Sequence, residues 1–157
     1  MNEEIPIRFA ADAMVGRLAR WLRILGHDIY YASKISDETL IDLARSEGRL
    51  ILTRDTRLLQ RKNLPPHLFI QDDRLEDQLR QVIRDLHIKA IGLLTRCLNC
   101  NLLLTPISRE EAKPWVPPYV YATQTRFRQC PGCRKIYWPG THVSKIMARL
   151  KELEPNP

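Results

Sequence analysis

The chain has 157 residues, of which 44% are hydrophobic and 27% charged, and its formal net charge is +7. This length fits one domain of ordinary size, or one small domain joined to a module too small to form its own core. No apolar run approaches the roughly 20 residues that cross a bilayer, and the start of the chain, MNEEIPIRFAA, lacks a signal-peptide pattern, so we expect a cytoplasmic protein with no membrane partner.

The first half of the sequence alternates between short apolar runs and amphipathic stretches. We expect strands at residues 7–12, 27–32, 50–55 and 67–71, and helices at 15–25, 36–48 and 72–87, with a short helix or turn in TRLLQRKN. Alternation of strands and helices with short links is typical of a mainly parallel sheet covered by helices. The predicted fold class is therefore α/β.

The first helix carries an apolar side and a basic side. Val15, Leu18, Leu22 and Leu25 share one face, whereas the arginines at positions 17, 20 and 23 occupy the opposite arc. Arg17 and Arg20 are candidates for contact with nucleic acid. A solvated face is the simpler interpretation for Arg23.

The positive charge is concentrated in the second part of the chain. Residues 1–88 hold 14 Lys/Arg and 14 Asp/Glu, whereas residues 89–157 hold 11 Lys/Arg and 4 Asp/Glu. A basic segment beside a neutral one suggests a surface for a polyanion, most often nucleic acid, although solubility alone is the plain alternative. Eight of the eleven prolines also follow residue 100. We therefore predict two parts, residues 1–90 and residues 91–157.

All four cysteines lie in the basic part as two Cys-x-x-Cys pairs, Cys97 with Cys100 and Cys130 with Cys133. Two such pairs in an intracellular chain can complete a tetrahedral thiolate shell, which predicts a structural zinc site in a small zinc ribbon. Iron, a redox pair or four unligated thiols are the alternatives. Cations that could contact RNA stand next to the second pair: Arg126, Arg128, Arg134 and Lys135. Tyr137 and Trp138 follow, either as stacking partners for bases or as the small core of the ribbon.

Three aspartates are the candidate catalytic residues. Asp12 and Asp55 each end a predicted parallel strand, and Asp37 begins a predicted helix. Because the carboxyl ends of parallel strands lie at one edge of a sheet, these acids could converge there and bind Mg²⁺ or Mn²⁺. Such a cation lowers the pKa of bound water and assists phosphoryl displacement. Taken singly, each aspartate could also be a helix cap or a first-turn acid.

Two further arginines, Arg54 and Arg57, flank Asp55. Cations in this position could hold an RNA backbone beside the metal. Patterns typical of Ser-His, Cys-His or phosphate-loop chemistry are absent from the sequence.

Several segments together resemble a known family. RFAADAMVGRLARWLRILGHD, SDETLIDLA and RLILTRDTRLL are similar to the PIN-like ribonuclease domain named after the C-terminus of the Mut-seven exonuclease, and RCLNCN, VPPYVY and CPGCRKIYWPGTHV are similar to its appended zinc ribbon. The resemblance implies a PIN-like fold, metal-dependent ribonuclease activity, and catalytic roles for Asp12, Asp37 and Asp55. Many PIN nucleases have a further acid shortly after the third one. This chain has none there, and Asp72 or Asp73 could replace it.

The leading functional hypothesis is a Mg²⁺- or Mn²⁺-dependent ribonuclease that cuts single-stranded RNA, with a zinc ribbon that helps to hold the RNA. The alternative is a non-catalytic RNA- or ribosome-binding protein on a PIN scaffold. A third interpretation makes the ribbon a protein–protein adaptor.

Overall fold

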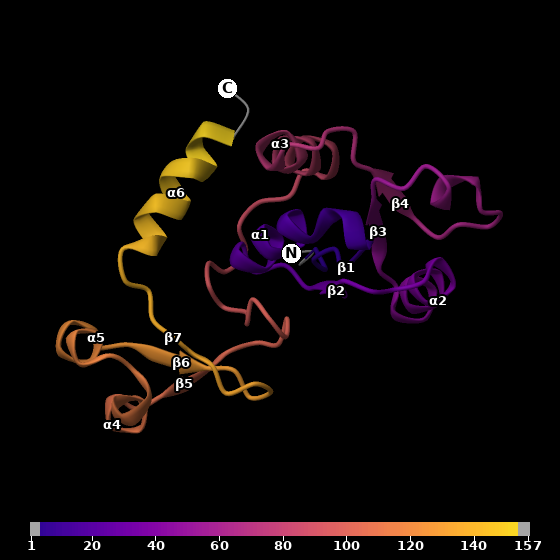
Figure 1. Cartoon of the computed structure of the whole chain (residues 1–157). Helices are drawn as coiled ribbons and strands as arrows, with labels where there is room; N and C mark the ends of the chain where they lie inside the picture. Colours follow the sequence, from indigo (N-terminus) through magenta and orange to yellow (C-terminus); the bar gives the residue numbers. More distant parts are fainter. Residues whose placement is uncertain (1–3, 154–157) are drawn as a thin grey trace.

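The computed structural model describes residues 4–153 of the chain. Its centre is a four-stranded parallel sheet with the strand order β2-β1-β3-β4 (Figure 1). These strands are β1 (Phe9–Ala11), β2 (Ile29–Tyr31), β3 (Leu50–Thr53) and β4 (His67–Phe69). Helices flank the sheet, which confirms the predicted α/β class.

The two central strands are buried on both faces. On one face, Phe9, Ala11 and Leu52 pack in the main core with the apolar residues of two helices, α1 (Gly16–Ile24) and α3 (Leu75–Leu86). On the other face, Ala10 and Ile51 pack with Leu40 and Ala44 of α2 (Asp37–Glu47). Because successive side chains of a strand point to opposite faces, short runs such as FAA and LIL supply both cores at once.

The helices begin and end close to the predicted positions. The hydroxyl of Ser36 accepts a hydrogen bond from the amide of Thr39 at 3.2 Å and so caps α2. Gly48 ends that helix with a left-handed φ of 64°. Two short 3-10 turns follow strands β1 and β3: η1 (Ala13–Val15) and η2 (Leu58–Gln60).

The second part of the chain forms an antiparallel sheet of three short strands, β5 (Thr105–Ile107), β6 (Phe127–Gln129) and β7 (Ile136–Tyr137). Between β5 and β6 lie α4 (Arg109–Ala112), η3 (Lys113–Trp115) and α5 (Pro118–Thr123). Four buried residues form its core: Ala112, Val116, Val120 and Phe127. So small a core leaves stability to be supplied by another source, for which a bound metal is suited.

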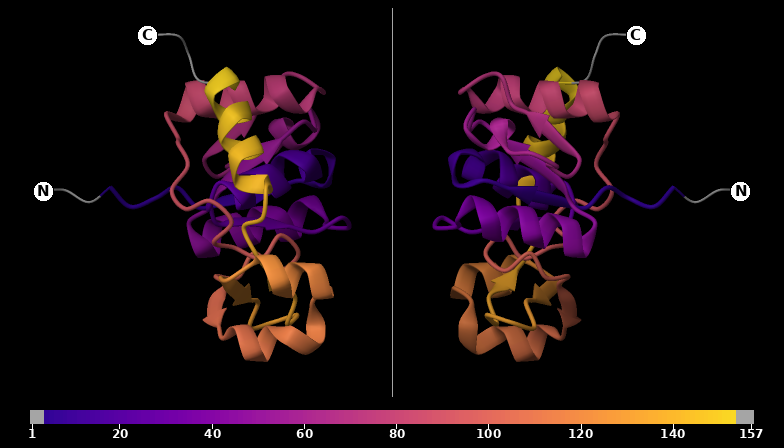
Figure 2. Two further views of the ribbon diagram at one scale, coloured as in Figure 1. Left: turned by 90° about the vertical axis from the view of Figure 1, so that its left-hand side faces the viewer. Right: turned by 90° about the vertical axis from the view of Figure 1, so that its right-hand side faces the viewer.

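The last helix, α6 (His142–Leu153), returns to the first part of the chain. Figure 2 shows it rising from the small sheet and lying across the helices of the larger one. Ile146 and Leu153 are buried in the main core, where α6 packs against α3. The sequence analysis predicted helices only up to residue 87, so this helix is a correction. Its apolar residues do follow helical spacing, at positions 143, 146, 150 and 153.

Arg23 is a second correction, because its side chain is buried and only 6% exposed. Its guanidinium donates hydrogen bonds to the carbonyl of Ile29 at 3.0 and 3.2 Å and to the carbonyl of Leu98 at 2.8 Å. Arg23 therefore joins the larger sheet to the first cysteine turn instead of lying on a solvated face. Helical spacing identified the polar side of α1 but could not show that a later segment covers it.

A glycine lets the segment between α3 and the first cysteine turn, residues 87–96 (the connecting segment), approach α1 closely. Gly26 has φ of +95°, and a Cβ placed there would lie 2.6 Å from the carbonyl oxygen of Gly92. A larger residue at position 26 would push this segment away from α1.

The predicted boundary at residue 90 stays a prediction, and residues 1–3 and 154–157 of the two predicted parts lie outside the described residues. Within the described part of the chain, every helix is too short or too polar to cross a membrane.

Candidate active site and metal centre

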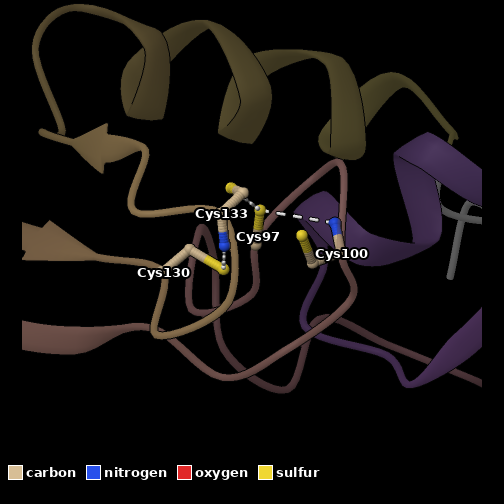
Figure 3. A group of neighbouring side chains, drawn as sticks. All are labelled: Cys97, Cys100, Cys130 and Cys133. Carbon is tan, nitrogen blue, oxygen red and sulfur yellow. Dashed lines mark hydrogen bonds between the residues drawn. The ribbon is translucent and has the colours of Figure 1, made fainter.

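The four cysteines meet in one cluster. Cys97 and Cys100 lie in the turn that follows the connecting segment, and Cys130 and Cys133 lie in the turn between β6 and β7 (Figure 3). Their sulfur atoms all lie within 4.8 Å of one another, and those of Cys97 and Cys133 are 3.7 Å apart. This arrangement could hold a metal such as zinc in a tetrahedral thiolate shell.

Backbone amides donate hydrogen bonds to two of the four sulfur atoms. The amides of Gly132 and Cys133 donate to Sγ of Cys130 at 3.3 and 3.5 Å, and the amide of Cys100 donates to Sγ of Cys97 at 3.4 Å. The hydroxyl of Tyr137 lies 3.2 Å from Sγ of Cys97. Backbone donors of this kind stabilise thiolate charge, so these turns are suited to metal ligands.

The pKa values of the cluster are strongly split. Burial raises the pKa of Cys97, but hydrogen bonds from Tyr137 and from the amides of Cys100 and Asn99 outweigh it and lower this pKa to about 6. The hydrogen bond with Cys133 raises the pKa of Cys100 to about 12. Burial raises the pKa of Tyr137, which keeps its hydroxyl as a donor. A divalent cation would replace the remaining thiol protons, so the donor set fits zinc.

Asp12 lies at the carboxyl end of β1 and is only 7% exposed. Its Oδ1 accepts a hydrogen bond from the amide of Met14 at 2.7 Å, which caps η1. Its Oδ2 accepts from the hydroxyl of Thr53 and from the amide of Arg54, the latter at 3.0 Å. None of the salt bridges found among residues 4–153 involves Asp12. A nearly buried carboxylate thus faces the sheet edge with hydrogen bonds but without a cationic side chain.

Asp55 lies at the same edge, two residues after β3. Its amide donates to the hydroxyl of Thr53 at 2.9 Å, and its Oδ1 accepts from the amide of Arg57, also at 2.9 Å. Thr53, which is fully buried, therefore links the two aspartates, since its hydroxyl donates to Asp12 and accepts from Asp55. Sequence analysis missed Thr53. The signal was a hydroxyl at a strand end, directly before a charged pair.

Asp37 is the first residue of α2, and its Oδ2 lies 3.7 Å from the guanidinium of Arg61. That guanidinium donates more closely to Glu38, at 2.6 Å. Within the part of the chain that the structure describes, the four cysteines are the one group of three or more metal-ligating side chains whose ligand atoms lie within 4.8 Å of one another. The three aspartates do not form such a group, and their shared role in metal binding stays a prediction.

The basic residues predicted to contact RNA are spread over both parts. Arg17 and Arg20 are exposed on α1, and Arg57 is 88% exposed beside Asp55, 3.9 Å from its carboxylate. Arg54 instead donates to the carbonyl of Ile70 at 3.0 Å. Four lie on the small sheet or its turns, and all of them are exposed: Arg126, Arg128, Arg134 and Lys135.

Asp72 and Asp73, the substitutes considered for a fourth acid, are both exposed. Asp73 and Arg17 line a cavity of about 280 Å³ that also borders Ala13 and Met14, the two residues after Asp12. This cavity adjoins the turn that follows Asp12, whereas Asp12 itself is not part of its lining.

The fold and the site define an α/β protein with a cluster of four cysteines that could hold a metal ion. Residues 7–150 of the chain match the Mut7-C RNAse domain, and the chain belongs to this family. The resemblance seen in the sequence is thereby confirmed, and family membership indicates a ribonuclease-like function with RNA as its substrate. No curated protein and no solved structure matches the chain.

Proposed function

We propose that the chain is a ribonuclease that depends on Mg²⁺ or Mn²⁺ and cuts single-stranded RNA at the edge of the sheet marked by Asp12 and Asp55. The observation that carries this proposal is the nearly buried carboxylate of Asp12, which has no ion-pair partner among the described residues and shares Thr53 with Asp55. Its hydrogen bonds offset part of the cost of burial but leave its negative charge without a cationic partner, and a divalent cation is a natural counter-charge.

Asp12, Asp37 and Asp55 are the proposed ligands of the catalytic metal. The chemistry of this set fits a hard cation, which prefers carboxylate oxygens. Asp12 accepts one hydrogen bond at Oδ1, and among the described residues Asp55 accepts a hydrogen bond at Oδ1 but none at Oδ2, which leaves lone pairs on both residues for a cation. When bound, Mg²⁺ or Mn²⁺ supplies Lewis-acid activation of phosphate and water.

The protein itself positions the RNA and the acids. The Thr53 hydroxyl orients the carboxylate of Asp12 and holds the backbone amide of Asp55, and the exposed guanidinium of Arg57 is placed beside Asp55 to contact a phosphate. Phosphate contacts are also proposed for the basic residues of α1, the segment after β3 and the small sheet: Arg17, Arg20, Arg54, Arg126, Arg128, Arg134 and Lys135. Arg54 has one hydrogen bond to Ile70 already, so it contributes through the rest of its guanidinium.

The four cysteines are proposed to hold a structural zinc that stabilises the zinc ribbon and takes no part in cleavage. A thiolate site of this kind needs a reducing compartment, which fits a cytoplasmic protein. We further propose that the large sheet has the PIN arrangement.

The deciding experiment is cleavage of a labelled single-stranded RNA by the purified zinc-loaded protein, with and without added Mg²⁺ or Mn²⁺. We expect metal-dependent cutting that falls at least about a hundredfold in Asp12→Asn, because metal activation contributes several kcal/mol to the transition state. Asp42→Asn, an exposed aspartate of α2, is the matched control and should cut normally. Undiminished cutting by Asp12→Asn would refute the assignment.

A second candidate is a non-catalytic RNA- or ribosome-binding protein. It is favoured by the three hydrogen bonds that Asp12 already accepts and by the separation of the three aspartates. It predicts salt-sensitive RNA binding without turnover at any Mg²⁺ or Mn²⁺ concentration.

A further inference from the structure

Four neighbouring cavities lie end to end between the zinc ribbon and the Asp12 edge. The first, of about 150 Å³, is on the small sheet, and it shares Leu94, Tyr137 and Trp138 with a second cavity of about 420 Å³ between α1, α6 and β7. Arg149 also lines the third cavity, of about 200 Å³. Arg17 and Leu75 connect the third to the cavity beside Ala13 and Met14. Each cavity shares at least one lining residue with the next, so the four form a row, which is called the depression below.

The depression is basic along its whole length. Its lining includes seven cationic residues: Arg126 and Arg128 at the ribbon, Arg20, Lys145 and Arg149 in the middle, and Arg17 and Arg74 toward Asp12. Two carboxylates, Glu76 and Asp73, also line it, and Glu76 is paired with Arg149 at 2.8 Å. The occupant that this charge favours is a polyanion.

Aromatic rings stand among these cations. Trp21, Tyr137 and Trp138 line the second cavity, and the Arg149 guanidinium lies 5.4 Å from the centre of the Trp21 ring. Aromatic faces beside cations bind bases by stacking, which needs bases that are not paired in a duplex. The lining therefore favours a single strand over a duplex and over a merely acidic protein surface.

Helix α6 forms one wall of the depression. Ile146 and Leu153 hold it on the main core, and the Arg149–Glu76 ion pair joins it to α3. Lys145 and Arg149 are four residues apart, which places them on the same side of the helix. The return of the chain to the larger sheet thus brings two cations over α1 that neither sheet supplies.

We propose that this depression is a groove for single-stranded RNA, with bases stacked on Trp21 and Trp138 and phosphates on the cations, and that it leads the strand from the zinc ribbon to Asp12. The claim that the groove delivers RNA to a cleavage site rests on the proposed ribonuclease function, whereas the claim that RNA binds along the groove does not.

Binding is measured by fluorescence anisotropy of a labelled single-stranded RNA with the full-length, zinc-loaded Asp12→Asn protein in the absence of added Mg²⁺ or Mn²⁺. In this background, Lys145→Glu should weaken binding about tenfold. It should also lower the magnitude of the slope of log binding constant against log salt concentration by about 0.7, the value for one phosphate contact on a single strand. Lys151→Glu, an exposed lysine on α6 outside the cavity linings, is the matched control and should leave both unchanged.

The stacking step has its own pair of variants. Trp138→Phe keeps an aromatic ring against Phe127 and should retain most of the affinity, whereas Trp138→Leu should lower it several-fold. The Trp115 side chain, which is 77% exposed and outside the cavity linings, provides the control Trp115→Leu. Circular dichroism and zinc content verify that each variant is folded.

The groove proposal would be overturned if Lys145→Glu and Lys151→Glu bound single-stranded RNA with equal affinity. It would also be overturned if the protein bound duplex RNA or polyglutamate as tightly as single-stranded RNA. The two proposals fail separately. Binding that depends on the groove, without cleavage at any metal concentration, would refute the proposed nuclease function and support the groove. Metal-dependent cleavage by the parent protein that Lys145→Glu does not impair would support the nuclease function and refute the groove.

Discussion

The side chain of Asn101 donates a hydrogen bond to Oδ1 of Asp28 at 2.7 Å, across the boundary between the first cysteine turn and the large sheet. The Asn101 amide oxygen also accepts a bond from the amide of Ile29 in β2, at 3.1 Å. Asn101 directly follows Cys100, so one side chain joins the cysteine cluster to the large sheet.

Replacing Asn101 with glycine should lower the free energy of unfolding by about 2 kcal/mol, since a hydrogen bond to a charged carboxylate and a bond to a buried amide are both lost. Glycine is chosen because position 101 has a φ of 67°, which glycine adopts without strain. Urea unfolding at pH 7 measures the change, and Asn63→Gly, at another position of positive φ, controls for the backbone effect.

The same variant should raise the pKa of Asp28. Burial raises that pKa in the native protein, but the hydrogen bonds of Arg49 and Asn101 outweigh burial and hold the pKa below its ordinary value. The folded-state pKa is therefore depressed, so the stability it contributes is present above the unfolded pKa of about 3.9 and is lost as pH falls through the folded value. An NMR titration of the carboxyl carbon follows the shift, and an unchanged pKa would contradict the role given to Asn101.

His27 should make the fold less stable in mild acid. Burial lowers its pKa, its Nε2 lies 2.7 Å from the carbonyl oxygen of Lys89, and its buried Nδ1 has no hydrogen-bond partner among residues 4–153. The unfolded chain binds the proton more readily, so the full stability is present above the unfolded pKa of about 6.5 and falls as pH drops toward the lowered value. Thermal unfolding between pH 7.5 and 5.5 should show this loss. His27→Gln should lose less over that interval, while His67→Gln, an exposed control, should behave as the parent does.

Thr53 should be a positioning residue for the catalytic acids. We expect Thr53→Val to raise the Mn²⁺ concentration that gives half-maximal cleavage by about 10- to 100-fold, the usual cost of losing a side chain that orients a metal ligand. Thr53→Ser keeps the hydroxyl and should restore the metal requirement. If valine changed stability but not the Mn²⁺ dependence, the hydroxyl would have only a structural role.

The cysteine centre should bind one zinc per chain. Metal analysis of the purified protein should give one equivalent, and Cys97→Ser should lose it and unfold the small antiparallel sheet, because ligand binding and folding are coupled in such modules. His142→Ala is the control: His142 is a nearby imidazole outside the cluster and should not alter the zinc content.

Local patterns predicted most of the large sheet. The apolar run LIL at Leu50–Leu52, the Ser36 cap and Gly48 each act within a few residues, so sequence alone was enough to place β3 and α2. The cysteine cluster was also predictable, because two Cys-x-x-Cys turns have few other uses.

The long-range partners were not predictable in the same way. Arg23 has the spacing of a solvent-facing residue, yet a segment 75 positions later covers it. Asp12 was recognised as an acid at a strand end, but only the folded chain shows that Thr53 and the amide of Arg54 occupy one of its oxygens. Such contacts depend on tertiary packing, which periodicity does not encode.

The return of α6 to the large sheet has a practical consequence for dissecting the protein. A truncation after residue 90 would strip Ile146 and Leu153 from the main core and leave part of that core open to water. A loss of RNA affinity in this truncated protein could then result from the exposed hydrophobic core as much as from the missing zinc ribbon. Designs that excise only the loop of small strands, and splice α6 back through a short flexible bridge, are the safer way to separate the two.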